Sequence, residues 1–346
     1  MKWFMTGGAG FIGANTARKL LDRGDRVVIY DNLSRRGSDV NLQSLSSDRL
    51  QFVAGDVRDF AKLSGAIGDE RPDVLLHLAG QVAVTTSVEH PREDFEINAA
   101  GAFNVCESVR TQARDAILLN ASTNKVYGEL PGVNVVERAG RYEYADMPFG
   151  VSESQPLDFH SPYGCSKGAA DQYVHDYARI YGIRSVNFRQ SCIYGRRQFG
   201  IEDQGWVAWF VIAAISGSAL TIYGDGKQVR DVLFVDDLVD CYIAAVERID
   251  RAAGSSFNIG GGPSRTLSLL ELVELIERRV HRKLNLRFSD WRPGDQRVFI
   301  SDIRKASEVL GWSPKTEVDA GVAALFEWTE AHRHLFAGLV AGKAGR

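Results

Sequence analysis

Short apolar runs alternate with amphipathic segments of helical length through the first half of the chain. The runs are rich in β-branched and aromatic residues, and they predict strands over residues 2–6, 26–30, 50–54, 73–79, 116–122 and 184–189. Each run is almost continuously apolar, as strands covered by helices on both faces must be. The alternation of strands with helices therefore predicts an α/β protein built on a doubly wound parallel sheet.

Beyond about residue 195 the regular alternation of predicted strands and helices ends. Loop-like stretches such as GRRQFGIEDQG and GGPSRT are followed by helical patterns over 267–280 and 303–310, without regular strands between them. Two strand-like pieces, 231–235 and 256–259, are expected to return to the first sheet. We therefore predict two interleaved domains: a dinucleotide-binding domain of residues 1–190 and 231–260, and a smaller, mostly helical substrate domain of residues 191–230 and 261–335.

The composition excludes several classes of partner. The 346 residues carry a formal net charge of only -3, so no strong field would recruit nucleic acid or an acidic membrane surface. The longest apolar run, residues 206–215, is too short to span a bilayer, and no leader segment precedes the first strand. The four cysteines lack a C-x-x-C spacing and are too sparse for a disulfide framework. We expect a soluble cytoplasmic protein without nucleic-acid or membrane partners.

A glycine-rich turn follows the first predicted strand. In the stretch MTGGAGFIG, Gly7, Gly10 and Gly13 allow a tight turn, a close approach of the backbone to a pyrophosphate, and close packing of the helix that begins at Phe11. The N-terminus of that helix would face the negative charge of the phosphates. Asp31 ends the second strand, where its carboxylate can accept hydrogen bonds from the ribose hydroxyls of adenosine.

These features predict a Rossmann dinucleotide site. A carboxylate at residue 31 would repel a 2′-phosphate, so it favours NAD over NADP, although Arg35 and Arg36 oppose that preference. The alternative is that the glycines form only a tight turn and that Asp31 caps a helix.

Two further loops fit the same cofactor. Residues 55–57 (GDV) end the third strand, where the adenine would lie, and residues 77–81 (HLAGQ) end the fourth strand near the nicotinamide.

His77 lies within an apolar run, so we interpret it as a hydrogen-bonded core histidine rather than a catalytic group. His332 and His334 near the C-terminus lack a third partner, and we predict no metal site.

Tyr163 and Lys167 stand four residues apart in the stretch SPYGCSKGAADQY, which places both on one helix face if Ser161 and Pro162 start a helix. A free phenol has a pKa near ~10, too high for a good base at neutral pH. A neighbouring ammonium and a cationic nicotinamide would both lower that pKa. Tyr163 could then remove the proton of a sugar hydroxyl while the carbon gives hydride to NAD. Alone, a Y-x-x-x-K spacing is common, but behind a dinucleotide fold it predicts this chemistry.

The fifth predicted strand ends in the polar stretch ASTNKVYG. Thr123 would project from the carboxyl edge of the sheet beside Tyr163, where its hydroxyl can bond the reacting oxygen and relay a proton. The alternative is that this stretch is only the polar end of a buried strand. Asn124 and Lys125 follow, so no carboxylate stands directly after the threonine.

These stretches resemble the extended short-chain dehydrogenase/reductase family of nucleotide-sugar epimerases and dehydratases, over nearly the whole chain. Within it, DNLSRRG, HLAGQVAVTTS, STNKVYG and LDFHSPYGCSKGAADQY are similar to the branch that epimerises CDP-linked sugars at C2. The 4,6-dehydratases carry an acidic pair after the threonine that is missing here, so the resemblance argues against dehydration. It implies a catalytic group of Thr123, Tyr163 and Lys167.

The resemblance also implies a tightly bound NAD that is regenerated in each turnover. The residues expected at this cofactor are Gly7, Gly10, Phe11, Ile12, Gly13, Asp31, Asn32, Ser34, Arg35, Asp56, Val57, Leu78, Ala79, Gly80, Gln81, Asn98, Ser122, Tyr163 and Lys167. Arg230 and Arg292, both expected in loops, would hold the substrate diphosphate because guanidinium groups suit phosphate oxygens. The residues expected at the substrate are Gln81, Thr86, Thr123, Asn124, Gln204, Gln228, Arg230 and Arg292, with surface hydrogen bonds or salt bridges as the alternative.

The implied reaction is epimerisation of a CDP-linked deoxyhexose at C2, through a transient 2-keto sugar that turns and is reduced on its other face. An epimerase acting at C4 or on another nucleotide sugar, or a simple dehydrogenase, would need the same three catalytic residues. A non-catalytic NAD-sensing protein would be expected to have lost Tyr163 or Lys167. In relatives the helices equivalent to 91–110 and 162–180 pair between subunits, which implies a homodimer or a homotetramer.

Overall fold

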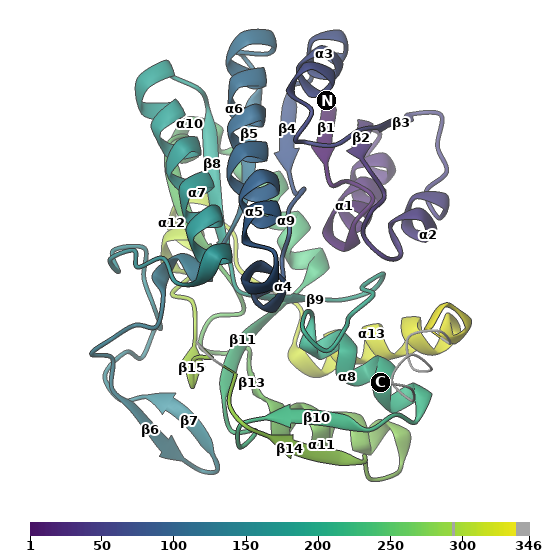
Figure 1. Ribbon diagram of the computed structural model, residues 1–346, viewed down its shortest axis with the longest axis vertical. Helices are drawn as coiled ribbons and strands as arrows, with labels where there is room; N and C mark the ends of the chain where they lie inside the picture. The colour runs from purple at the N-terminus through teal and green to yellow at the C-terminus, as the bar shows by residue number, and fades with distance from the viewer. Residues whose placement is uncertain (293–294, 337–346) are drawn as a thin grey trace.

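The computed structural model describes residues 1–292 and 295–336, and its largest element is a seven-stranded sheet (Figure 1). All neighbouring strands of this sheet are parallel, in the order β12-β8-β5-β4-β1-β2-β3. The strands are β1 (Lys2–Thr6), β2 (Arg26–Asp31), β3 (Leu50–Ala54), β4 (Val74–His77), β5 (Ile117–Thr123), β8 (Ser185–Gln190) and β12 (Ser255–Ile259). The predicted doubly wound sheet is therefore confirmed.

Helices cover both faces of this sheet because its strands are apolar on both sides. Phe4 points to one face, where it packs in a core with side chains of α3 (Phe60–Glu70), α6 (Gly101–Gln112) and α7 (Ser161–Tyr181). Its neighbour Met5 points to the other face. That face is covered by α1 (Phe11–Asp22), α9 (Val235–Glu247), α10 (Ile249–Ala252) and α12 (Arg304–Leu310), with α2 (Ser38–Gln43) packed on α1.

The segment predicted as a helix over 91–110 is interrupted by one wide turn. It consists of α5 (Pro91–Phe95), a π-helical turn η1 (Glu96–Ala100) and α6, and it is preceded by the short helix α4 (Val84–Glu89). A π-turn inserts one extra residue and is frequent at functional sites. Here it rotates Asn98 toward the loop that follows β4, to which Asn98 is hydrogen-bonded.

The rest of the chain forms small sheets and helices, which lie below the large sheet in Figure 1. The strand β11 (Val229–Phe234) pairs with β9 (Cys192–Tyr194), β13 (Thr266–Ser268) and β15 (Val298–Phe299). The remaining strands are β10 (Leu220–Tyr223), β14 (Leu286–Ser289), β6 (Val135–Arg138) and β7 (Arg141–Tyr144). The helices are α8 (Trp206–Ser216), α11 (Leu269–Val280) and α13 (Val318–Ala331), with short 3-10 turns η2 (Asn124–Tyr127) and η3 (Arg333–Phe336).

Two local expectations are wrong. The helical segments after residue 260 do have strands between them, β14 and β15, which are too short to show a period in the sequence. Of the two strand-like pieces expected to return to the large sheet, only β12 does so, because β11 is paired in the separate small sheet. It is the helix after β11, α9, that returns and packs on α1. The division into two interleaved domains remains a proposal.

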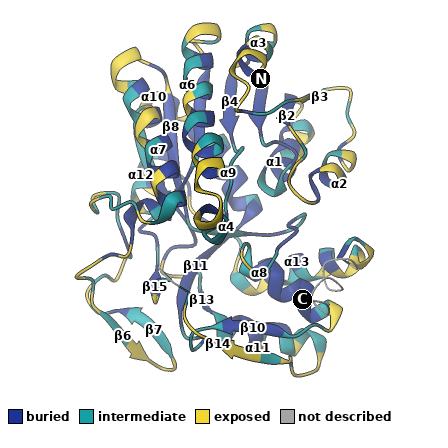
Figure 2. Ribbon diagram, viewed as in Figure 1, coloured by how far each residue is buried: buried dark blue, intermediate teal, exposed yellow. Residues whose placement is uncertain are grey.

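The long apolar run near residue 210 is a core helix. It forms α8, whose side chains are buried against α11 and α13, and Figure 2 shows buried residues along the large sheet and exposed residues at the outer helix ends. Within residues 1–292 and 295–336, no helix combines the length and the apolar character needed to cross a bilayer.

Candidate functional site

A cavity of about 550 Å³ opens at the carboxyl ends of β1 and β4, the point from which the sheet winds in opposite directions. Gly7 lies at its floor with a φ angle of 68°, and a side chain there would place its first carbon 2.5 Å from the backbone nitrogen of Ala79. Only glycine fits such a position. The turn after β1 and the loop after β4 are therefore in direct contact, and both line the cavity.

The helix α1 starts at the cavity wall with unpaired backbone donors. Its N-cap, Gly10, offers no side chain, and no acidic residue occupies the first turn. The amides of Phe11, Ile12 and Gly13 precede the first residue that can bond within the helix, so they face outward without a helical partner. Three such N–H groups and the positive end of the helix suit the diphosphate of a dinucleotide.

The carboxylate of Asp31 is anchored at the next strand end. Its two oxygens accept hydrogen bonds from the backbone nitrogens of Ala9 (3.0 Å) and Leu33 (2.8 Å). Burial raises the pKa of Asp31, and these two bonds oppose that rise. The carboxylate is thus held against the glycine turn on the cavity wall, where it can still accept bonds from ribose hydroxyls.

Asp56 marks the far end of the cavity. Its carboxylate bonds to Arg58 (2.7 Å) and to the amide of Asn32 (2.8 Å). The bond from Arg58 is the main reason that its pKa is lowered to about 2. Asp56 therefore presents a fixed negative charge beside Val57, and both of its oxygens already accept bonds from Arg58 or Asn32.

Every residue predicted at the cofactor lines this cavity except Asn98. Asn98 instead holds Gln81 in place: its Oδ1 accepts from the Gln81 backbone nitrogen (2.9 Å) and its Nδ2 donates to the Gln81 carbonyl (3.0 Å). The Oε1 atom of Gln81 is buried and has no hydrogen-bond partner among the described residues. An unpaired acceptor on the wall suits the amide or hydroxyl donors of a bound ligand.

Part of the cavity wall was not predicted. Residues 196–199 follow β9 and cross the groove beside α1 and α2; we call them the crossing segment. Asn15 donates to the Arg196 carbonyl (2.9 Å), Asn41 donates to that of Arg197 (3.3 Å), and Gly37 gives room to the ring of Phe199. The lining residues that the sequence analysis did not assign to a site are Tyr30, Ser38, Asn41, Glu93, Ile97, Gln190, Arg197, Gln198 and Phe199. Arg36, Gly55, Val82 and Ala121 also line the cavity, and they belong to stretches that the sequence analysis singled out.

Tyr163 and Lys167 lie on the first turns of α7, which Pro162 starts as predicted. The Tyr163 backbone nitrogen donates to Ser87 (3.1 Å), and Lys167 Nζ donates to the Ala121 carbonyl at the end of β5 (2.6 Å). Both side chains are buried and line the cavity. Burial lowers the pKa of Lys167 to about 8, and the carboxylates of Asp171 and Asp94 act against that fall.

The expected lowering of the Tyr163 pKa is not found among the chain's own residues. Burial raises the pKa of Tyr163 to about 12, although a hydrogen-bonding interaction with the Thr123 side chain acts downward. Burial outweighs this hydrogen bond because the phenolate is removed from water, and the charge of Asp94 adds to the rise. The contribution expected from a cationic nicotinamide remains a prediction.

Thr123 and Asn124 lie at the end of β5 but do not line the cavity. Thr123 is buried, and its hydroxyl accepts a bond from the Lys125 backbone nitrogen (3.3 Å) and donates to Asn124 Oδ1 (3.4 Å). Lys125 has its pKa lowered by burial and by the charge of Arg230. No carboxylate follows the threonine, in agreement with the sequence.

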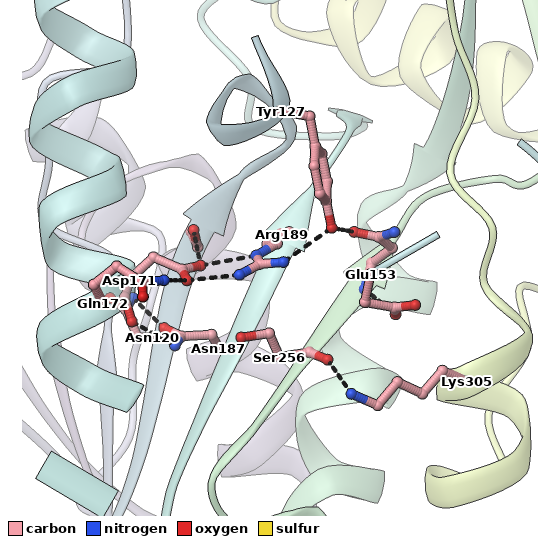
Figure 3. A network of polar contacts seen from close by, with 11 residues as sticks. Asn120, Tyr127, Glu153, Asp171, Gln172, Asn187, Arg189, Ser256 and Lys305 are labelled. Atoms are coloured by element: carbon pink, nitrogen blue, oxygen red, sulfur yellow. Dashed lines mark hydrogen bonds and ion pairs between the residues drawn. The ribbon is translucent and has the colours of Figure 1, made fainter. Parts of the chain in front are cut away.

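A buried ion pair stands behind this site (Figure 3). Arg189 on β8 forms two bonds to Asp171 on α7, 3.1 Å from Nε and 2.9 Å from Nη2, and Figure 3 shows its other side facing Tyr127. The same carboxylate accepts from Ser122 (2.7 Å), the residue before Thr123. Ser122 is thus fixed between α7 and the sheet.

The predicted substrate residues divide into two groups. Gln81, Thr86 and Gln204 line the cavity, whereas Gln228, Arg230 and Arg292 do not. Arg230 lies in β11 rather than in a loop, which corrects that expectation, and it pairs with Asp295 (2.6 Å). Arg292 pairs with Asp203 (2.8 Å) and stacks on the ring of Tyr223.

His77 is a core residue, as the sequence predicted. It is buried, and its Nδ1 lies 2.7 Å from the hydroxyl of Thr6. Burial, with a smaller effect of the Lys167 charge, lowers its pKa to about 3. His77 is therefore neutral at physiological pH.

The sequence model of the family described as GDP-mannose 4,6 dehydratase matches residues 4–325. The chain belongs to this family of nucleotide-sugar epimerases and dehydratases. Across 339 aligned residues the chain is 46% identical to the CDP-paratose 2-epimerase of Salmonella typhi, covering 96% of this chain and 100% of that one.

Solved structures of relatives share the whole fold. The UDP-glucuronic acid 4-epimerase of Bacillus cereus, crystallised with UDP-glucuronic acid and NAD, has a TM-score of 0.84 at 28% identity and covers 96% of this chain and 100% of its own. The dTDP-glucose 4,6-dehydratase of Streptomyces venezuelae, crystallised with NAD, has a TM-score of 0.85 at 27% identity, covering 98% and 100%. The predicted family and fold are confirmed, and NAD, the predicted cofactor, is the one these neighbours contain.

Proposed function

We propose that this chain epimerises a CDP-linked deoxyhexose at C2, converting CDP-paratose to CDP-tyvelose or acting on a close analogue. The main support for this proposal is the 46% identity to a CDP-paratose 2-epimerase over 96% of the chain, together with the presence of Tyr163 and Lys167 at the cavity. The chain is an NAD-dependent nucleotide-sugar epimerase, and the choice of C2 and of CDP is the finer proposal.

The residues at the cavity have separate tasks in this reaction. Bound NAD supplies a hydride acceptor that becomes the donor for the return step. Tyr163 removes the proton of the C2 hydroxyl and later gives it back. Thr123 interacts with the phenol and orients the reacting oxygen, while the Lys167 ammonium favours the phenolate form of Tyr163.

The groups around Thr123 favour epimerisation over dehydration. Expelling water from a sugar needs an acid and a base beyond the tyrosine. The positions after Thr123 hold Asn124, which is neutral, and Lys125, which is buried beside Arg230. No carboxylate at these positions can act as the required acid.

Two arginines are suited to the substrate diphosphate. Arg230 and Arg292 each form an ion pair with one carboxylate, Asp295 and Asp203 respectively. A diphosphate offers the guanidinium groups more charge and more oxygens than one carboxylate does, so it can replace these partners. Gln204 and Thr86, at the cavity, are then left for the sugar or the base.

A second copy of the chain is the proposed partner. The outer faces of α5, α6 and α7 expose Phe95, Phe103, Tyr173, Ile180 and Tyr181. An apolar face of this kind, on helices that pair in relatives, supports a homodimer or a homotetramer built from two such dimers. Sedimentation at micromolar concentration tests this, since a monomer would contradict it. The cytoplasmic location also remains a prediction.

The experiment incubates the purified protein with CDP-paratose, CDP-glucose and their UDP and GDP counterparts in deuterated buffer, and follows the sugar protons by NMR. Inversion at C2 of the CDP sugar without uptake of deuterium at that carbon is expected, because hydride returns from the cofactor. Deuterium at C2 would contradict the redox mechanism. Inversion at C4 of a UDP sugar would instead favour the 4-epimerase reaction, which the UDP-glucuronic acid 4-epimerase neighbour makes the second candidate. A steady rise in NADH absorbance would indicate a dehydrogenase.

A further inference from the structure

The carboxylate of Asp94 is buried behind the catalytic helix. Asp94 lies in α5 and is only 1% exposed. Its Oδ2 accepts a bond from Ser166 (2.5 Å) and its Oδ1 accepts one from Asn98 (3.1 Å). Within residues 1–292 and 295–336, no cationic side chain forms an ion pair with it, which is unusual for a carboxylate removed from water.

The two bonding partners of Asp94 lead directly to the reactive groups. Ser166 stands between Tyr163 and Lys167 on α7, and its hydroxyl also contacts the Tyr163 carbonyl (3.2 Å). Asn98, in the π-turn, holds the backbone of Gln81 by two bonds. One carboxylate therefore connects the catalytic helix to the loop at the nicotinamide end of the cavity.

Lys167 also lies near the Asn98 amide that bonds Asp94. A methyl group built on Gly80 would lie 3.0 Å from Asn98 Oδ1 and 3.9 Å from Lys167 Nζ, so the ammonium is near the group that bonds Asp94. Burial lowers the pKa of Lys167, and the carboxylates of Asp171 and, to a smaller extent, Asp94 oppose that fall. Burial raises the pKa of Asp94, and the bond from Ser166, the charge of Lys167 and the bond from Asn98 oppose that rise. The charge of Asp94 also adds to the rise in the Tyr163 pKa that burial causes.

The other charged groups around Lys167 are already balanced. Asp171 is paired with Arg189 by two hydrogen bonds (Figure 3). His77 on β4 is neutral, because its pKa is about 3. On the elements that pack against α5, Glu89 of α4 is exposed and Glu96 of η1 pairs with Arg92. Glu93 of α5 is exposed at the cavity, and Asp171, whose effect on the Lys167 pKa is the larger, is shared with Arg189. Among these carboxylates, Asp94 is the buried one without a cationic partner among the described residues.

We propose that Asp94 is a positioning residue of this site, whose buried carboxylate provides the counter-charge of Lys167 and fixes the Tyr163–Lys167 turn against the cofactor loop. It touches neither the cavity nor the reacting atoms. This inference rests on the proposed oxidation chemistry for its kinetic consequence, but its electrostatic part concerns the folded chain alone.

The kinetic test replaces Asp94 by the isosteric asparagine in the NAD-loaded enzyme. Loss of the negative charge lowers the pKa of both Tyr163 and Lys167, so both limbs of the pH profile of kcat/KM are expected to move to lower pH, by about one unit for a charge within several ångströms. Because Tyr163 and Lys167 are coupled, the two apparent pKa values of the profile belong to the pair and not to either residue alone. Glu96→Gln removes a partly exposed carboxylate two residues away and is the control, which should leave the profile in place. A folded, NAD-binding Asp94→Asn enzyme with an unmoved profile would overturn the proposal.

A double-mutant cycle of thermal stability tests the coupling between Asp94 and Lys167 without any substrate. It also applies if Asp94→Asn is too unstable for kinetic measurements. Thermal unfolding is measured for the wild-type chain, Asp94→Asn, Lys167→Met and the double variant. If Asp94 balances Lys167, Asp94→Asn should lower Tm clearly in the wild type and much less in the Lys167→Met background, where no ammonium is left uncompensated. Equal losses in both backgrounds would make Asp94 a simple hydrogen-bond acceptor and refute the inference. This coupling is present even if the chain turns over none of the nucleotide sugars, so its failure is distinct from failure of the proposed reaction.

Discussion

Replacing Asp171 by asparagine tests how strongly the buried ion pair holds the catalytic helix to the sheet. Asp171 is fully buried and Arg189 is 6% exposed, and the carboxylate accepts bonds from Arg189, Ser122 and Gln172. The neutral amide leaves the guanidinium with Tyr127 as its remaining side-chain partner. Removing one member of a buried pair costs about 3–5 kcal/mol, because the other charge stays desolvated. For a chain of 346 residues, whose entropy of unfolding is about 0.7 kcal/mol/K, that corresponds to a fall in Tm of roughly 4–7 °C, at about 1.4 °C for each kcal/mol.

The assay is thermal unfolding followed by circular dichroism, with NAD at fixed concentration. Asp176→Asn, on the same helix, is the matched control, because Asp176 pairs with Arg179 at the surface. An exposed pair contributes about 0–1 kcal/mol, so the control should lose no more than about 1.5 °C. Similar losses in the two variants would refute the assignment of a buried, uncompensated charge. Adding Arg189→Met to Asp171→Asn should recover part of the loss, since both charges are then absent.

Three further results are expected. Tyr163→Phe should keep NAD binding, measured by calorimetry, and lower kcat by at least about 10²-fold, because it removes the proton acceptor; retained activity would exclude Tyr163 as the base. Gly13→Ala would set a carbon 2.5 Å from the Gly8 backbone, so it should cost about 1–3 kcal/mol and weaken NAD binding, whereas Gly65→Ala, which meets nothing within 4 Å, should change neither. His77 has its pKa lowered from 6.5 to about 3, so its contribution to stability is lost as pH falls from 6.5 toward 3, by up to about 1.4 kcal/mol per pH unit; His77→Gln should flatten that slope in melts between pH 7 and 5, and an unchanged slope would contradict the shift.

The large sheet and the cofactor cavity were accessible from the sequence because local patterns determine them. An apolar strand followed by glycines at fixed spacing is compatible with few structures other than a dinucleotide-binding turn. The positions of Gly7 and Asp31 then follow from the ends of the two strands. The same holds for Tyr163 and Lys167, whose spacing is a property of one helix. These predictions concern residues within single elements or at the same edge of one sheet.

The features that the sequence did not reveal depend on contacts between distant segments. The crossing segment reaches the cofactor groove only because Asn15 and Asn41 bind its carbonyls, and nothing in its own pattern encodes that partner. The pairing of β11 in a small sheet depends on strands of two or three residues. The rise in the Tyr163 pKa arises from burial by surrounding elements, which a local reading of tyrosine beside lysine omits.

The crossing segment has a consequence for how the protein exchanges its dinucleotide. The peptide carbonyls of residues 196 and 197 accept hydrogen bonds from Asn15 on α1 and Asn41 on α2, which hold this segment at the cavity wall, and we expect these bonds to slow the departure of a bound dinucleotide. Slow departure is a handicap for a dehydrogenase, which must swap oxidised for reduced cofactor in every cycle. For a catalyst that restores its own oxidant before each product leaves, the same slow exit keeps a half-finished sugar and its hydride together.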